Sequence, residues 1–293
     1  MTNMEKDLKK KLEKNMEKDP KKNLEKSEEM GPKRNSEESM ERTMTQAVFK
    51  RYEKKYMVSS EQYNELISRM ITRMDADQYG KHTICNIYFD TVDYQMIRNS
   101  LDKPVYKEKL RLRSYGRCME EGTVFLELKK KYAGVVYKRR VPMKLKDARK
   151  YLYYGIKPEL DSQILREIDY AVDFYEPRPA VYLAYERIAF SGKDDPELRI
   201  TFDMNVRARS FGLDLSQKTY GVPIMEQGQM LMEIKIPGAM PVWLGSLLSE
   251  LEIYPVSFSK YGMYFQKYLM PGGIFGDRTE NQNTDGKRGV ICA

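Results

Sequence analysis

The chain has few of the residues that most metal and redox sites need. Its 293 residues include one histidine, one tryptophan and three cysteines. The single histidine, His82, removes most histidine-based catalysis and metal binding from consideration. Cys85, Cys118 and Cys292 share no CxxC spacing, so neither a disulfide framework nor a cysteine zinc site is expected. Apolar runs of about 18 residues are also absent, and no cleavable apolar signal core is present, so we expect a cytoplasmic chain without a membrane span.

Positive charge and tyrosine are what the sequence has in excess. It contains 51 Lys and Arg residues against 43 Asp and Glu residues, a net charge of +8, and 22 tyrosines. A positive excess indicates an anionic partner. Charge alone does not separate nucleic acid, a membrane surface and phosphate compounds from one another.

Composition divides the chain into three parts. Residues 1–45 are rich in Lys and Glu and contain no aromatic residue, so they cannot bury enough apolar surface to offset the entropy of ordering. From Pro271-Gly272-Gly273 onward, Asn, Asp, Gly and Thr are typical of a flexible tail. We therefore expect a disordered charged leader over 1–45, one folded domain over 46–270 and a flexible tail over 271–293.

Two periodicities predict the elements of the folded domain. Apolar and polar residues alternate with period two in eight segments, which predicts eight half-buried strands. The segments are 48–58, 83–90, 106–114, 123–131, 135–142, 180–190, 197–205 and 229–236. Helical spacing of apolar residues predicts four helices, over about 59–75, over 145–154, from about 161 and from 241.

In several predicted strands the polar face carries mostly Lys and Arg. Leu110 and Leu112 alternate with Lys109, Arg111 and Arg113, and alternate residues of a strand point to the same side. For any single strand, a polar face in contact with water explains such a pattern. Because the pattern recurs and amphipathic helices are available to cover the apolar faces, closing the sheet into a barrel would turn the charges inward. The result would be a basic, water-filled tunnel.

A tunnel lined with cations has a specific chemistry. Crowded cations repel one another unless a polyanion or several bound anions neutralise them. Arg offers forked donors to phosphate oxygens, and Lys offers a compact charge. Isolated glutamates among them supply hard oxygen ligands for Mg²⁺ or Mn²⁺. The lining therefore predicts a metal–nucleotide or metal–polyphosphate site.

Nine short motifs follow one another in order between residues 48 and 268. They are RYEKKY (51–56), YFDT (88–91), KLRLRSYG (109–116), FLELK (125–129), KRR (138–140), YER (185–187), LRITFD (198–203), EIK (233–235) and SFSKY (257–261). In this order they resemble the polyphosphate polymerase domain of the vacuolar transporter chaperone complex, within the triphosphate tunnel metalloenzyme superfamily. The resemblance implies an α+β fold, an eight-stranded antiparallel β tunnel barrel with helices packed on its outside, which binds triphosphate chains with a divalent cation.

The resemblance also implies a role for individual residues. The residues expected to be catalytic are Lys55, Arg111, Arg113, Lys129, Arg187 and Arg199. The residues expected to bind the substrate chain are Lys138, Arg140, Lys235, Ser259 and Lys260. The expected ligand of Mn²⁺ or Mg²⁺ is Glu233, followed by Glu53 and Glu127.

The activity that the resemblance implies is polyphosphate synthesis from ATP. The terminal phosphoryl group of ATP would pass to the end of an inorganic polyphosphate chain, whose oxygen is already anionic and needs no strong base. The branch of the superfamily that hydrolyses triphosphate or forms cyclic nucleotides usually opens with Glu-x-Glu-x-Lys. Arg51, Glu53 and Lys55 stand at these positions here, which favours the polymerase branch.

Several alternatives stay open at this point. The same lining would serve a hydrolase of tripolyphosphate or nucleoside triphosphate, a non-catalytic polyphosphate-binding module or, more distantly, an RNA-capping triphosphatase. No RNP-type aromatic motif is present, so we expect no nucleic-acid partner. The expected partners are ATP and inorganic polyphosphate. A separate membrane partner could recruit the chain, and the sequence leaves the oligomeric state open.

Overall fold

The computed structural model describes residues 52–133 and 135–270. The expected leader over 1–45 and the expected tail over 271–293 lie outside the described residues. Arg51 and the start of the predicted strand 48–58 also lie outside them. None of the helices in the described part of the chain has the length and apolar character that crossing a membrane requires.

The strands form one sheet in which every pairing is antiparallel. Its main path runs through β1 (Tyr52–Val58), β10 (Met230–Ile236), β8 (Arg199–Arg209), β7 (Arg178–Gly192), β3 (His82–Asp90), β4 (Tyr106–Tyr115), β5 (Thr123–Tyr132) and β6 (Val135–Lys144). The short strands β2 (Met74–Ala76) and β9 (Val222–Pro223) pair with β7 and β8. The eight predicted strands are thus present, and β2 and β9 are additions.

The sheet does not close into the expected barrel within residues 52–133 and 135–270. Strands β1 and β6, at the two ends of the path, do not pair with each other. The free edge of β1 is instead occupied by the chain before α9, where Val256 N donates a hydrogen bond to Lys55 O (2.7 Å). The sheet still curls, because Lys129 Nζ on β5 lies 3.8 Å from Glu53 Oε2 on β1. One face of the sheet is therefore concave.

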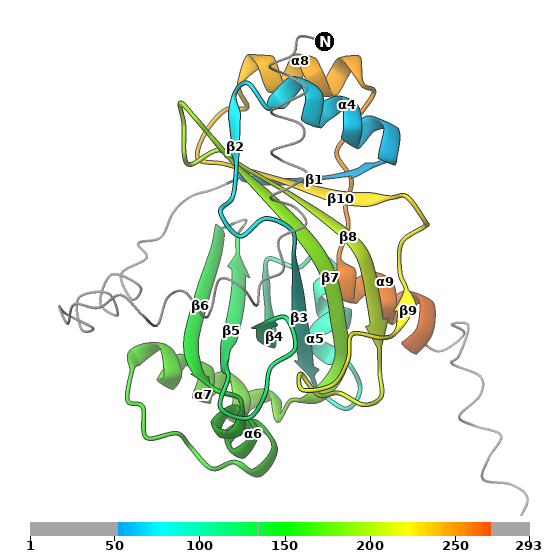
Figure 1. The fold of residues 1–293 in the computed structure, drawn as a ribbon. Coiled ribbons are helices and arrows are strands. Elements are labelled where there is room, and N and C mark those ends of the chain that lie inside the picture. Colours follow the sequence, from blue (N-terminus) through cyan, green and yellow to red (C-terminus); the bar gives the residue numbers. More distant parts are fainter. Residues whose placement is uncertain (1–51, 134, 271–293) are drawn as a thin grey trace, which may run out of the picture.

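Helices cover the apolar face of the sheet in two pairs, at opposite ends of the molecule (Figure 1). The first pair is α4 (Ser60–Met70) and α8 (Val242–Glu250), whose apolar side chains pack with those of β1, β8 and β10. The second pair is α6 (Leu145–Tyr154) and α7 (Gln163–Tyr175), which pack on β3, β4 and β5. These four helices therefore lie on the outside of the curled sheet, as predicted.

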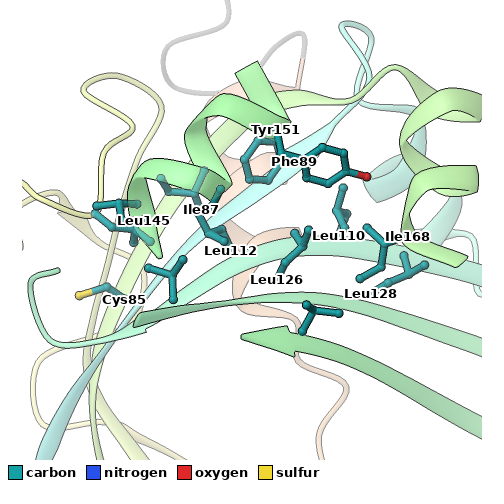
Figure 2. Packing of buried hydrophobic residues seen from close by; sticks show 14 of the residues in the cluster. Cys85, Ile87, Phe89, Leu110, Leu112, Leu126, Leu128, Leu145, Tyr151 and Ile168 are labelled. Carbon is teal, nitrogen blue, oxygen red and sulfur yellow. The ribbon is translucent and has the colours of Figure 1, made fainter. Parts of the chain in front are cut away.

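The packing under α6 and α7 shows how alternation sorts the side chains. Leu110 and Leu112 of β4 and Leu126 of β5 are almost completely buried against Leu145 and neighbouring helix residues (Figure 2). Because successive residues of a strand point to opposite faces, the charged residues between these leucines face the concave side.

One predicted helix is too long, and three short helices were not predicted. Helix α4 begins with the capping box of Ser59 and Gln62 but ends at Met70, so the predicted helix over 59–75 is too long. Met74 instead pairs with Gly192 of β7, and strand pairing replaces the last helical turn. Three short helices were not predicted: α5 (Gln95–Leu101), α9 (Lys260–Tyr264) and the π-helix η1 (Phe265–Leu269). They are too short for a periodic signal.

These three short helices fill part of the concave side. Ile84 on β3 and Leu183 on β7 form a buried cluster with Tyr261, Tyr264 and Phe265. The concave face is thus divided into an apolar part under α5, α9 and η1 and a charged part beside it.

Candidate functional site

A cavity of about 420 Å³ lies on the charged part of the concave face. Its cationic lining residues are Lys55, Lys109, Arg111, Arg113, Lys129, Lys138, Arg139, Arg187, Lys235 and Lys260. Among the described residues only two carboxylates, Glu53 and Glu233, line it. Such an excess of positive charge within a curled sheet favours the binding of a polyanion.

Glu233 stands at the centre of one cationic group. Its carboxylate lies 3.3 Å from Lys260 Nζ, 3.6 Å from Lys55 Nζ and 3.6 Å from Arg187 Nη2. Although burial opposes ionisation, the charges of Lys260, Lys55 and Arg187 hold the pKa of Glu233 well below its usual range. Glu233 is therefore a carboxylate anion at neutral pH.

Asp203 supports this group from behind. Arg187 donates to both carboxylate oxygens of Asp203, at 2.5 and 2.7 Å, and Lys260 Nζ lies 2.5 Å from Oδ2. The Asp203 side chain is completely buried, and the charges of Lys260 and Arg187 lower its pKa against the effect of burial. A forked pair of this kind fixes the guanidinium plane of Arg187 and leaves its remaining N–H groups for a ligand.

Glu127 is the buried counter-ion for the cations of β4 and β6, as Asp203 is for Arg187 and Lys260. It accepts a 2.7 Å hydrogen bond from Arg111 Nε, and Lys138 Nζ lies 3.0 Å away. Arg113 and Arg140 lie at 3.8 and 3.4 Å. Glu127 is 1% exposed and does not line the cavity. It is therefore a buried counter-ion that orients the arginines.

The carboxylates of the cavity offer a small donor set for a divalent cation. Glu53 and Glu233 both approach Lys55 Nζ, at 3.7 and 3.6 Å, so an ammonium group already lies beside both carboxylates. Two carboxylates suit Mg²⁺ or Mn²⁺ when phosphate oxygens and water complete the shell. The described residues contain no group of three or more His, Cys, Asp and Glu that could hold a metal without such help. Glu127, enclosed by cations, does not fit a metal.

The sequence interpretation assigned no site role to six lining residues: Tyr88, Lys109, Val136, Tyr137, Arg139 and Tyr185. Two of them, Lys109 and Tyr88, have hydrogen bonds to other lining residues. Lys109 Nζ lies 3.2 Å from Ser259 Oγ, and burial, with the nearby charges of Lys55 and Lys129, lowers the pKa of Lys109 to about 8. Because Lys109 and Arg111 are two residues apart in a predicted strand, the sequence already placed both on the same face of the sheet. Tyr88 accepts a hydrogen bond from Arg111 Nη1 (3.1 Å), and although burial opposes it, the Arg111 charge lowers the pKa of Tyr88 to about 8. Tyr88 begins the YFDT motif, but the motif alone gave it no role in the site.

The structure brings most of the predicted residues to the cavity but leaves two cations outside its lining. Arg199 lies at the start of β8, where Nη2 is 3.5 Å from Asp77 Oδ2. The Arg140 guanidinium lies over the Phe125 ring, 3.7 Å from its centroid. Both residues share a face with lining residues, Arg199 being opposite Lys235 in the sheet. Their side chains turn to Asp77 and to the Phe125 ring, outside the lining of the cavity.

Comparison with known proteins gives one family match. The VTC domain matches residues 50–268 of this chain. The chain is also 24% identical over 273 residues to vacuolar transporter chaperone complex subunit 4 of Trypanosoma cruzi (strain CL Brener). This match covers 75% of the chain and 34% of the relative, so the chain spans about a third of the length of that protein.

Two solved structures are similar at low identity. A proposed adenylate cyclase from Bacillus halodurans is 17% identical, with a TM-score of 0.46, over 71% of this chain and 92% of that one. A proposed adenylyl cyclase from Hippeastrum, described as having a dominant triphosphatase activity, is 16% identical, with a TM-score of 0.45, over 75% of this chain and 97% of that one.

Proposed function

We propose that this chain, which belongs to the VTC domain family, is a polyphosphate polymerase that transfers the terminal phosphoryl group of ATP to an inorganic polyphosphate chain. The observation that carries the proposal is the cavity lining, in which clustered Lys and Arg face two anionic glutamates. Phosphoryl transfer depends mainly on alignment and charge neutralisation. These are what a rigid set of cations supplies.

The proposed roles follow from the contacts. Arg111 and Arg187 are held by the buried carboxylates Glu127 and Asp203, so their remaining N–H groups are preorganised for the transferring phosphoryl group. The other proposed catalytic residues are Arg113, Lys55 and Lys129. The residues proposed to bind the polyphosphate chain are Lys109, Lys138, Lys235, Ser259 and Lys260.

Glu233 and Glu53 are proposed to hold Mn²⁺ or Mg²⁺. When bound, the cation would neutralise phosphate charge and orient the phosphate oxygens. Lys55, which contacts both glutamates, is proposed to contribute its ammonium charge to the phosphate chain.

The lining favours an anionic acceptor over water. It contains no histidine, and Glu233, whose pKa is far below its usual range, is a weak base. A phosphate oxygen needs no deprotonation. Hydrolysis is the second candidate because Lys109, with a pKa of about 8, could accept a proton from water.

The test is to incubate the purified protein with ATP and Mn²⁺ and to separate the products by size. A polymerase produces long phosphate chains and ADP. Release of orthophosphate alone would identify a hydrolase, and polyphosphate binding without ATP turnover would identify a binding module. Lys55→Ala should abolish chain synthesis. Lys54→Ala is the matched control, because Lys54 immediately precedes Lys55 in β1, is exposed and does not line the cavity.

A further inference from the structure

A second row of lysines continues the cavity lining outward along β4 and β5. In the sheet register Lys109 lies opposite Lys129, and two residues further along the strands Lys107 lies opposite Lys131. Residues two apart share a face, and the two rows are separated by about 6.7 Å. Lys109 and Lys129 line the cavity, whereas Lys107 and Lys131 lie beyond it.

The lysines of the outer row differ from most cations around the cavity in their ion pairing. Within residues 52–133 and 135–270, no carboxylate lies within ion-pair distance of Lys107 or Lys131, nor of the neighbouring Lys103. Lys107 Nζ donates a hydrogen bond to Ser100 O, at 3.0 Å. Like charges directly opposite each other destabilise a sheet. Burial lowers the pKa of Lys107, and the charges of Lys131 and Lys103 lower it further.

Neighbouring cations that face elsewhere are neutralised. Lys130, on the other face of β5, contacts Glu108 and Glu167, each at 3.7 Å. Arg199 and Arg140, which share a face with lining residues but lie outside the lining, are also paired, Arg199 with Asp77 and Arg140 with Glu127. The repulsion therefore remains where the lysine row leaves the cavity on the β4–β5 side.

We propose that Lys103, Lys107 and Lys131 bind successive phosphates of a linear polyphosphate chain where it passes out of the cavity between β4 and β5. The identity of this polyanion rests on the proposed function. A cavity of about 420 Å³ encloses only a short length of chain, so a longer chain must continue over the surface. Over β3, β7 and β8 the concave side is filled by the apolar cluster under α5, α9 and η1, which offers no contact to phosphate. The lysine row provides a positively charged surface along which the polyphosphate chain can leave the cavity.

The test compares short and long ligands on a double variant, Lys107→Ala with Lys131→Ala. Its control is Lys150→Ala with Lys218→Ala. These two lysines are exposed and lie outside the cavity lining, and their substitution changes the net charge by the same amount. Dissociation constants are measured for tripolyphosphate and for chains of several tens of phosphates, each at low and moderate salt. Thermal unfolding of both variants verifies that they fold.

The row variant should bind tripolyphosphate within about twofold of wild type and long chains about tenfold more weakly, a difference of about 1.4 kcal/mol. Its long-chain affinity should also depend less on salt, because fewer phosphates are neutralised. An equal loss for both ligands, or no loss for long chains, would overturn the inference. If wild type fails to polymerise ATP but the row variant selectively loses long-chain binding, the proposed function fails and the lysine row stands.

Discussion

Glu127 on β5 accepts a 2.7 Å hydrogen bond from Nε of Arg111, the residue directly opposite it on β4. The carboxylate is buried beneath the cavity rather than in it. The pair therefore shows how this fold holds a cationic surface together: anions beneath the lining offset part of the repulsion and leave the exposed donors for a ligand. Each of the following predictions depends on that arrangement.

Replacing Glu127 with Gln should destabilise the protein strongly. It removes a buried charge that faces Arg111, Arg113 and Lys138, and breaking a buried ion pair costs about 3–5 kcal/mol. Urea unfolding at pH 7 measures the change in the free energy of unfolding. The control is Glu121→Gln, whose exposed carboxylate pairs with surface lysines. Equal effects of the two substitutions would contradict the assigned role of Glu127.

Stability should decrease in acid. Glu127, Asp203 and Glu233 all have folded-state pKa values below their usual ones, whereas the unfolded chain has values of about 3.9 for Asp and 4.3 for Glu. The unfolded state therefore binds more protons, so this stabilisation is complete above about pH 5 and is lost as the pH falls through 4. Unfolding free energies between pH 7 and pH 3 test this. The slope should be shallower in Glu127→Gln, and an unchanged slope would exclude Glu127 as a contributor.

Phosphate binding should weaken between pH 7 and pH 9. Lys109 and Lys138, both with a pKa of about 8, lose positive charge in this range, and Tyr88, also with a pKa of about 8, gains negative charge. All three changes reduce attraction for an anion. Calorimetric titration with tripolyphosphate across this range measures the effect. Lys109→Arg keeps its charge and should give a flatter profile; a profile identical to wild type would show that Lys109 does not bind the phosphate.

Glu233→Gln should separate metal binding from phosphate binding. Without the carboxylate, Mn²⁺-dependent turnover of ATP should fall by at least about 100-fold, beyond the range of a lost outer-shell partner. In the presence of a chelator, tripolyphosphate should bind as tightly as to wild type or more tightly, because an anion has left the cationic cavity. A parallel loss of metal-free binding would indicate that Glu233 only holds the lining cations in place.

Arg187→Ala should reduce turnover far more than Arg199→Ala. Arg187 lines the cavity and is fixed by Asp203, whereas Arg199 is half-exposed beside Asp77. Steady-state kinetics on both variants compare the two positions. A larger loss of turnover for Arg199→Ala would mean that the polyphosphate chain contacts the protein beyond the cavity, on the β8 side.

Alternation along the strands was enough to predict the eight main strands and the face of the cations between buried leucines. It correctly placed Lys109, Arg111 and Arg113 on one surface, because a period of two leaves no other choice once the leucines are buried. It did not show that the side chain of Arg199 turns to Asp77 and that of Arg140 to the Phe125 ring, outside the cavity lining to which the resemblance assigned them.

Other features depend on contacts between segments that are distant in sequence. Tyr88 reaches the cavity because β3 pairs with β4 in a register that sets it opposite Arg111. The barrel stays open because the chain around Val256 occupies the edge of β1. No local pattern encodes either pairing, so neither could be predicted from the residues nearby.

The most direct test of the central claim is amine-reactive labelling with and without tripolyphosphate, quantified for each lysine by mass spectrometry. If the concave face binds phosphate, the ligand should protect Lys55 and Lys129, whereas their strand neighbours Lys54 and Lys130, on the other face, should be labelled to the same extent with and without it. Equal protection of neighbours, or protection of neither, would contradict an inward-facing phosphate site.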